Sequence, residues 1–170
     1  MATYIALLRG INVVGANQLP MKDLTALCGD CGFANARTWI QSGNALFESR
    51  LQEAAVQRKL ESALAAKMGK KIAVVVRTPA EIRAVLDTNP FPDKEPSKVL
   101  VAFLNGPMPA DPLAGMVALG GEQVHVGRRE VYIYYPDGVG RSKLKLPLAG
   151  AATTARNINT VAKLVALSGT

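Results

Sequence analysis

The chain has 170 residues, of which 49% are hydrophobic and 19% charged, and its formal net charge at pH 7 is +7. This composition supplies enough apolar side chains for a folded core and excludes a disordered or collagen-like chain. No apolar run reaches the ~20 residues that span a bilayer, and the first residues lack the basic start and long apolar stretch of a signal peptide. We therefore expect a cytoplasmic protein of one domain or two small ones.

Hydrophobic periodicity in the first half predicts the order strand, helix, strand, strand, helix, strand. The expected elements are a strand at 3–9, a helix from Pro20 to about Gly32, strands at 36–41 and 45–48, a helix that ends at Gly69, and a strand at 71–77. This is the order of a ferredoxin-like split βαβ sandwich. A further short helix is expected to open with the capping pair Thr78 and Glu81.

The second half begins after the proline-rich segment 89–97, which we interpret as a linker between subdomains at 1–88 and 98–170. Its expected elements are a strand at 98–104, a helix at 112–119, strands at 123–126 and 131–135, a basic loop, and a helix at 157–167. The pattern resembles a second copy of the first half without a closing strand. The predicted fold class is therefore α+β, with tandem ferredoxin-like subdomains of which the second is incomplete.

This topology predicts that two polar segments lie close together. In a split βαβ unit the first two strands are parallel, because the helix between them returns the chain to the starting edge. The loop after the first strand and the turn after the second strand then lie at the same end of the sheet. We therefore expect Arg9 and Asn12 beside Gln41, Ser42 and Asn44, a cluster that offers a guanidinium, amides and a hydroxyl.

Positive charge is concentrated near the end of the chain, where seven basic and two acidic residues follow from Arg128 onward. The loop 136–143 contains two glycines, which allow backbone N–H groups to surround an anion. There Arg141 could contact an anion with two parallel hydrogen bonds, and Ser142 and Lys143 could add further donors. The spacing is not that of a P-loop, and the alternative is a β-turn with a flexible surface loop.

Arg156 is expected just before, or in the first turn of, the last helix. A bound anion at this helix start would interact favourably with Arg156 and accept the free N–H groups, with Asn157 as a further donor. The alternative is that Asn157 or Thr154 caps the helix while Arg156 points to solvent or pairs with a carboxylate.

Five other chemically active side chains favour structural interpretations. Cys28 and Cys31 lie on an apolar helical stripe, which predicts packing in the core. Zinc would need two further ligands, and the chain has one histidine and no third cysteine. That histidine, His125, alternates with valines and should face solvent. Tyr132 and Tyr134 share one strand face and should pack against the other subdomain rather than stack on a base.

Five stretches resemble the signatures of a bacterial family, domain-of-unknown-function family 1697: residues 4–13, 20–21, 37–44, 140–144 and 154–161. The sequence differs from the family pattern at Trp39, where tyrosine is common, and at Ile158, where tryptophan is usual. The second difference removes a ring that could stack on a nucleobase. The resemblance implies a tandem ferredoxin-like fold and a small intracellular protein, but it implies no established activity.

We therefore expect a binding module for a phosphate-bearing or other anionic ligand, such as nucleic acid. Arg141 and Arg156 would be the main anchors, Ser142, Lys143 and Asn157 would support them, and the cluster around Asn12 would be a second recognition element. One alternative is an enzyme that acts by positioning and charge stabilisation, although Asp137 is the sole carboxylate expected nearby. Another is a structural protein in which Arg and Asn side chains bridge subdomains or subunits. No nucleophile, acid–base pair, metal site or cofactor is predicted.

Overall fold

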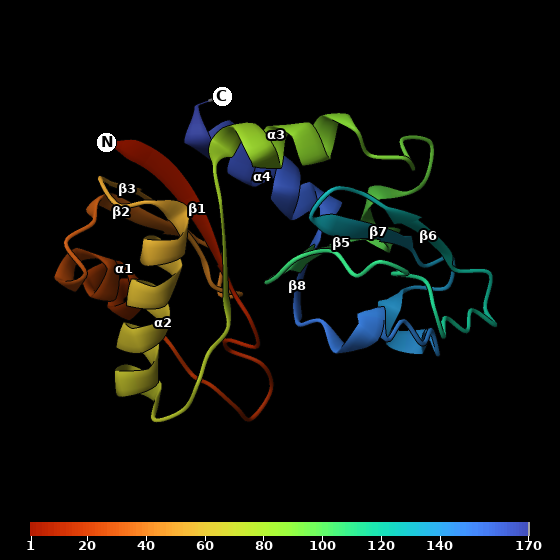
Figure 1. Cartoon of the computed structure of the whole chain (residues 1–170), viewed down its shortest axis with the longest axis horizontal. Helices are drawn as coiled ribbons and strands as arrows, with labels where there is room; N and C mark the ends of the chain where they lie inside the picture. The colour runs from red at the N-terminus through yellow and green to blue at the C-terminus, as the bar shows by residue number, and fades with distance from the viewer. Residues whose placement is uncertain (170) are drawn as a thin grey trace. The chain divides into compact units, whose positions relative to one another are not determined.

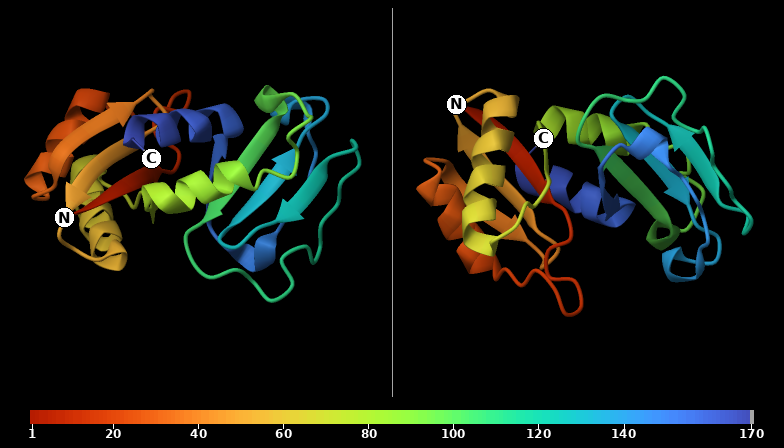
Figure 2. Two further views of the ribbon diagram at one scale, coloured as in Figure 1. Left: turned by 90° about the horizontal axis from the view of Figure 1, so that it is seen from above. Right: turned by 60° about the horizontal axis from the view of Figure 1, so that its bottom comes forward.

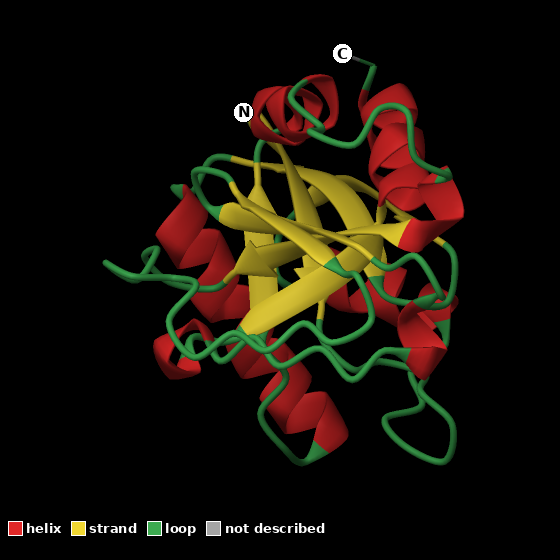
Figure 3. Ribbon diagram, turned by 90° about the vertical axis from the view of Figure 1, so that its right-hand side faces the viewer, coloured by secondary structure: helices red, strands yellow, loops and turns green. Residues whose placement is uncertain are grey.

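Eight strands form two separate four-stranded antiparallel sheets in the computed structural model, which describes residues 1–169 (Figure 1, Figure 3). The chain divides into two units: Met1–Ile82 with the segment from Leu164 onward, and Arg83–Lys163. Four α-helices accompany the strands over the described residues. The predicted α+β class is thereby confirmed.

The first unit contains the six elements expected from periodicity: β1 (Ala2–Leu8), α1 (Met21–Asp30), β2 (Ala34–Trp39), β3 (Asn44–Ser49), α2 (Glu53–Met68) and β4 (Val74–Arg77). The strands are ordered β2-β3-β1-β4, and every neighbouring pair is antiparallel. Because β1 and β2 both run opposite to β3, they are parallel to each other, as predicted.

One face of this sheet packs against α1 and α2 (Figure 1). Alternate residues of β1, including Tyr4 and Leu8, form this core with buried side chains of both helices, such as Leu24 and Leu60. The opposite face of β1 is buried as well, since Ile5 is fully covered. Burial on both faces explains why β1 is a continuous apolar run rather than an alternating one.

The second unit contains the end of α3 (Pro79–Asp87) and a second sheet built from β5 (Val99–Leu104), β6 (Gln123–Val126), β7 (Glu130–Tyr134) and β8 (Thr153–Asn157). Its order is β6-β7-β5-β8, again antiparallel throughout. Three short 3₁₀ helices lie at Pro96–Lys98, Val139–Arg141 and Leu148–Gly150, and α4 (Ile158–Ser168) follows β8.

Two features of this unit correct the sequence prediction. The expected helix at 112–119 is absent, because Gly115 has a φ of +79° and Val117 instead exchanges two backbone hydrogen bonds of 2.9 Å with Lys145. A closing strand was not expected, yet residues 153–157 form β8 at the edge of the sheet. The second unit thus has the closing strand and lacks a helix between β5 and β6.

Candidate functional site

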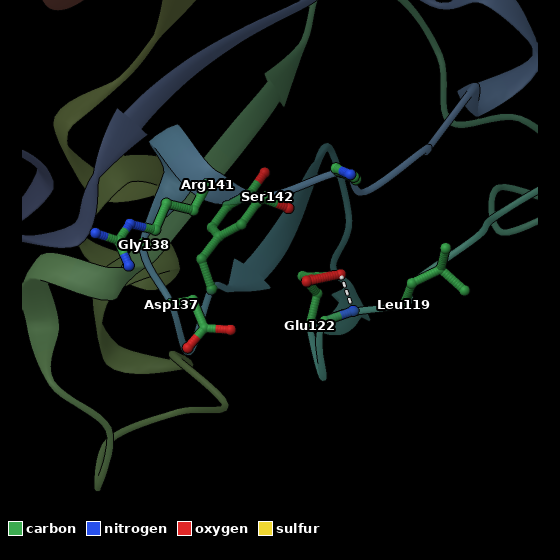
Figure 4. Close-up of a pocket in the computed structure, with 9 residues that line it drawn as sticks. Leu119, Glu122, Asp137, Gly138, Arg141 and Ser142 are labelled. Atoms are coloured by element: carbon green, nitrogen blue, oxygen red, sulfur yellow. Dashed lines mark hydrogen bonds between the residues drawn. The ribbon is translucent and has the colours of Figure 1, made fainter.

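The glycine-containing loop 136–143 lines a cavity of about 170 Å³ in the second unit (Figure 4). Segment 119–122 and Tyr135 form the rest of its wall. The lining residues are Leu119, Gly120, Glu122, Tyr135, Asp137, Gly138, Arg141, Ser142 and Lys143. Three of the residues proposed from sequence as anion ligands, Arg141, Ser142 and Lys143, therefore line one cavity.

Local hydrogen bonds shape the loop around this cavity. Gly138 has a φ of +83°, a conformation that favours glycine, and its N–H donates to the carbonyl of Tyr135 at 3.0 Å. The next three residues form a 3₁₀ turn, which the N–H of Ser142 closes by donating to the Val139 carbonyl at 3.1 Å. The Ser142 hydroxyl then accepts the N–H of Leu144 at 3.1 Å. These contacts define the backbone conformation of the loop around the cavity.

The cavity is lined by charges of both signs. Arg141 and Lys143 contribute positive groups, and Glu122 and Asp137 contribute carboxylates. In the part of the chain that the structure describes, none of these four forms an ion pair. The sequence pointed to Asp137 but not to Glu122, which reaches the cavity through the pairing of two distant loops.

Glu122 is held at the wall by its own loop. Its Oε1 accepts the backbone N–H of Gly120 at 3.1 Å, drawn as a dashed line in Figure 4. Burial, and to a smaller extent the negative charge of Glu122, raises the pKa of Tyr135 above its usual 10.0. Figure 4 shows the Arg141 side chain extending away from the Glu122 and Leu119 side of the cavity.

Arg156 does not line this cavity and does not lie in a helical turn. It is on β8 opposite Val101, only 8% exposed, and its Nη1 donates to the carbonyl of Ala155 at 2.9 Å. Burial lowers the pKa of its guanidinium from 12.5 to about 10, so Arg156 is a buried cation at neutral pH. Arg156 thus lies two residues before α4, as expected, but on a strand and not in a helical turn.

Asn157 caps the last helix and is one of the two caps that the structural alternative offered. Its Oδ1 accepts the N–H of Asn159 at 2.8 Å, and its Nδ2 donates to the Ser97 carbonyl at 3.0 Å. Both ends of the amide are therefore occupied by contacts within the second unit. Asn157, like Arg156, is absent from the cavity wall.

The predicted proximity of the two polar segments in the first unit is confirmed. Asn12 Nδ2 donates to the Gln41 carbonyl at 2.7 Å and to the Leu19 carbonyl at 2.8 Å, and Asn12 Oδ1 accepts the N–H of Leu19 at 2.7 Å. Asn44 is fully buried, and its Nδ2 donates to the Trp39 carbonyl at 3.0 Å and to the Ser42 hydroxyl at 3.1 Å. These amides hold the loop and the turn in place.

Arg9 lies at the same end of the first unit, at the base of the long loop after β1. Its side chain is exposed, and its backbone N–H donates to the carbonyl of Ala73 at 3.0 Å. Figure 1 and the right-hand view of Figure 2 show this loop projecting past the end of β1. The structure therefore assembles the cluster expected around Asn12, with its amides engaged and its guanidinium exposed.

Comparison with known proteins identifies the family of this chain. Residues 1–132 match the model of a family described as proteins of unknown function, DUF1697. The chain belongs to the DUF1697 family. The matched stretch contains the cluster around Asn12 and also Glu122, and it ends before the loop that carries Arg141.

A solved structure shares the fold of this DUF1697 protein. The conserved bacterial protein SP0830 from Streptococcus pneumoniae superposes with a TM-score of 0.79 and 22% sequence identity, covering 98% of both chains. At this identity the likeness concerns the fold alone. No curated protein matches the sequence.

The cysteines of this DUF1697 protein are buried free thiols, as the helical stripe predicted. Burial first, and then the neighbouring Cys31, raises the pKa of Cys28 to about 12. A nucleophilic or metal-binding cysteine needs its thiolate form, so both observations favour packing. Over residues 1–169, no group of His, Cys, Asp and Glu could hold a metal ion.

The remaining ring side chains also follow their structural interpretations. His125 is exposed on β6, and Tyr132 is buried with its hydroxyl donating to the Val85 carbonyl at 2.7 Å. A buried tyrosine is inaccessible to a base that would stack on it. Among the described residues, no helix has the length and apolar character needed to cross a membrane.

Proposed function

We propose that this DUF1697 protein is a binding module whose cavity takes an acidic group of a small ligand. The observation that carries the proposal is that Arg141 and Lys143, on the glycine-containing loop 136–143, both line one cavity. Neither side chain forms an ion pair with a described residue. Cations left unneutralised at a concave surface attract an anionic guest.

The two cations would recognise the acidic group in different ways. The planar guanidinium of Arg141 can donate two parallel hydrogen bonds to a phosphate or carboxylate, whereas the Lys143 ammonium acts as a point charge. The cavity, about 170 Å³, is smaller than the ~300–1,000 Å³ of pockets that enclose drug-sized ligands. It therefore suits a small metabolite or one charged end of a larger ligand such as a nucleotide.

We also propose that both units are ferredoxin-like. The first unit has the strand order 4-1-3-2 of that fold when read from β4, and the second unit repeats it with β5 to β8. The register supports the correspondence. In each sheet, residues paired from strand to strand form a row across all four strands. The row is Arg37, Leu46, Ile5 and Arg77 in the first sheet, and His125, Tyr132, Val101 and Arg156 in the second.

The last member of each row strengthens this inference. Arg77 and Arg156 are both buried, at 3% and 8% exposure, and each donates from Nη1 to the carbonyl of the preceding residue. Each also lies within two residues of the start of a helix, α3 or α4. We therefore propose for Arg156 a structural role shared with Arg77, in place of the ligand-anchor role expected from sequence.

A thermal-shift panel of phosphate, mononucleotides and short oligonucleotides tests the binding function. A ligand at 100 times its dissociation constant should stabilise the wild type by about 2.7 kcal/mol, and Arg141→Ala should remove most of that gain. Lys145→Ala is the matched control, because it removes an exposed charge from the same segment outside the cavity. No shift with any ligand, or equal shifts in wild type and Arg141→Ala, would disprove the proposal. A steep loss of affinity with salt would identify nucleic acid as the ligand.

A further inference from the structure

The two carboxylates that line the cavity restrict the chemistry of the rest of the ligand. Glu122 and Asp137 line the same cavity as Arg141 and Lys143, yet none of the four forms an ion pair with a described residue. Opposite charges around one small cavity usually neutralise each other by direct contact. Here no such contact forms among these described residues, so the positive and the negative groups of the wall both remain available to a guest.

The negative region is fixed by the backbone of segment 119–122. Glu122 Oε1 accepts the N–H of Gly120, and a Cβ atom at position 120 would overlap the Glu122 carboxylate. Glycine at 120 therefore permits this close approach. Figure 4 shows Glu122 on one side of the cavity and the Arg141 guanidinium directed to the other side.

A purely anionic guest would match only part of this wall. Its charge would be attracted by Arg141 and Lys143 but repelled by the carboxylates of Glu122 and Asp137. A guest with an ammonium group beside its acidic group would turn the second interaction from repulsion to attraction. Charge complementarity in the cavity thus favours a guest that carries both charges over a simple anion.

We infer that the ligand is a small zwitterion, with its acidic group at Arg141 and Lys143 and its ammonium group at Glu122. This inference rests on the proposed binding function and specifies its ligand class. The volume of about 170 Å³ restricts the enclosed part to a molecule of amino-acid or aminoalkyl-phosphate size. Asp137, which is more exposed than Glu122, adds further negative potential to the cavity wall.

Isothermal titration of the full chain with three matched probes tests this inference. The probes are inorganic phosphate, ethanolamine and phosphoethanolamine, which present the anion, the ammonium group and both together. We expect phosphoethanolamine to bind about two- to fivefold more tightly than phosphate, the gain of one partly exposed ion pair. Glu122→Gln should weaken phosphoethanolamine binding by a similar factor and should tighten phosphate binding, because it removes attraction for one probe and repulsion for the other.

Two controls separate a ligand contact from a structural effect. Glu95→Gln removes an exposed carboxylate of the same unit outside the cavity and should change neither affinity. Gly120→Ala keeps the charge of Glu122 but displaces its carboxylate, and it should lower phosphoethanolamine binding with an unchanged unfolding temperature.

The outcomes distinguish this inference from the proposed function. If phosphate binds and phosphoethanolamine binds no more tightly, the zwitterion inference is wrong while anion binding stands. If neither probe binds, both are wrong. A Glu122→Gln variant that weakens both probes equally would show that Glu122 only maintains the cavity wall, which also overturns the inference.

Discussion

At the scale of single residues, Gly43 is required by two independent features of the turn between β2 and β3. Its φ of +85° is in the left-handed region, and a Cβ atom at this position would lie 3.0 Å from Leu8 Cβ. The close approach is imposed by the hydrogen bond from the Leu8 N–H to the Gly43 carbonyl, 2.9 Å long. This bond joins the turn to β1, beside the loop that Asn12 anchors.

Gly43→Ala should therefore lower the free energy of unfolding by about 2–4 kcal/mol, adding backbone strain to a clash in a packed region. Gly15→Ala is the matched control, because Gly15 has a φ of +73° but a Cβ atom added there would have no neighbouring atom within 4 Å. It should cost only about 1–2 kcal/mol of strain. Urea unfolding of both variants measures the difference, and equal losses would show that contact with Leu8 contributes nothing.

At the scale of elements, α3 starts with a reciprocal cap between two side chains. The Thr78 hydroxyl accepts the Glu81 N–H at 3.2 Å, and Glu81 Oε1 accepts the Thr78 N–H at 3.3 Å. Two backbone donors that the helix leaves unpaired are thereby satisfied. The sequence predicted this helix start correctly because a capping box is a local pattern.

Thr78→Ala should lower the free energy of unfolding by about 1 kcal/mol, the usual contribution of an N-cap hydroxyl. Thr78→Ser keeps the hydroxyl and should lose much less, as measured by the midpoint of urea unfolding. If the serine variant lost as much as the alanine variant, packing of the threonine methyl group would be responsible instead of the cap.

Where local pattern and tertiary structure disagree, the sequence prediction was wrong. Residues 112–119 have apolar residues at helical spacing, but Leu119 is 81% exposed, so that spacing reflects no packed helical face. Strand β8 lacks apolar alternation because its buried face carries Thr154 and Arg156. Periodicity detects an apolar face, and it therefore missed a strand whose covered face is polar.

The candidate site likewise contains residues that local sequence predicted and one that it missed. Arg141 and Ser142 could be proposed from sequence, because glycines and donors are adjacent in one loop. Glu122 lies about twenty residues earlier and reaches the cavity through pairing of the loop segments around Val117 and Lys145. That long-range contact has no local signature, so the negative part of the cavity could not be predicted.

At the scale of the whole molecule, buried thiol and phenol groups make the folded state less stable at alkaline pH. Burial raises the pKa of Cys28 from 9.0 to about 12, and it also raises the pKa values of Cys31 and Tyr132. Between pH 9 and 12 the unfolded chain releases the Cys28 proton while the folded chain retains it. Because the folded state then binds more protons, its stability must fall as pH rises. The lowered pKa of Arg156, about 10, acts in the opposite direction at higher pH.

Comparing wild type with Cys28→Ala isolates the contribution of this thiol. The variant loses packing at any pH, so wild type should be the more stable protein at pH 8. At pH 10 the wild type alone carries the Cys28 penalty, and the difference in unfolding free energy should shrink by about 1 kcal/mol. Urea titrations at both pH values measure that difference, in which groups common to both proteins cancel. A difference that stays constant from pH 8 to pH 10 would show that the folded state does not hold the Cys28 proton more tightly than the unfolded chain.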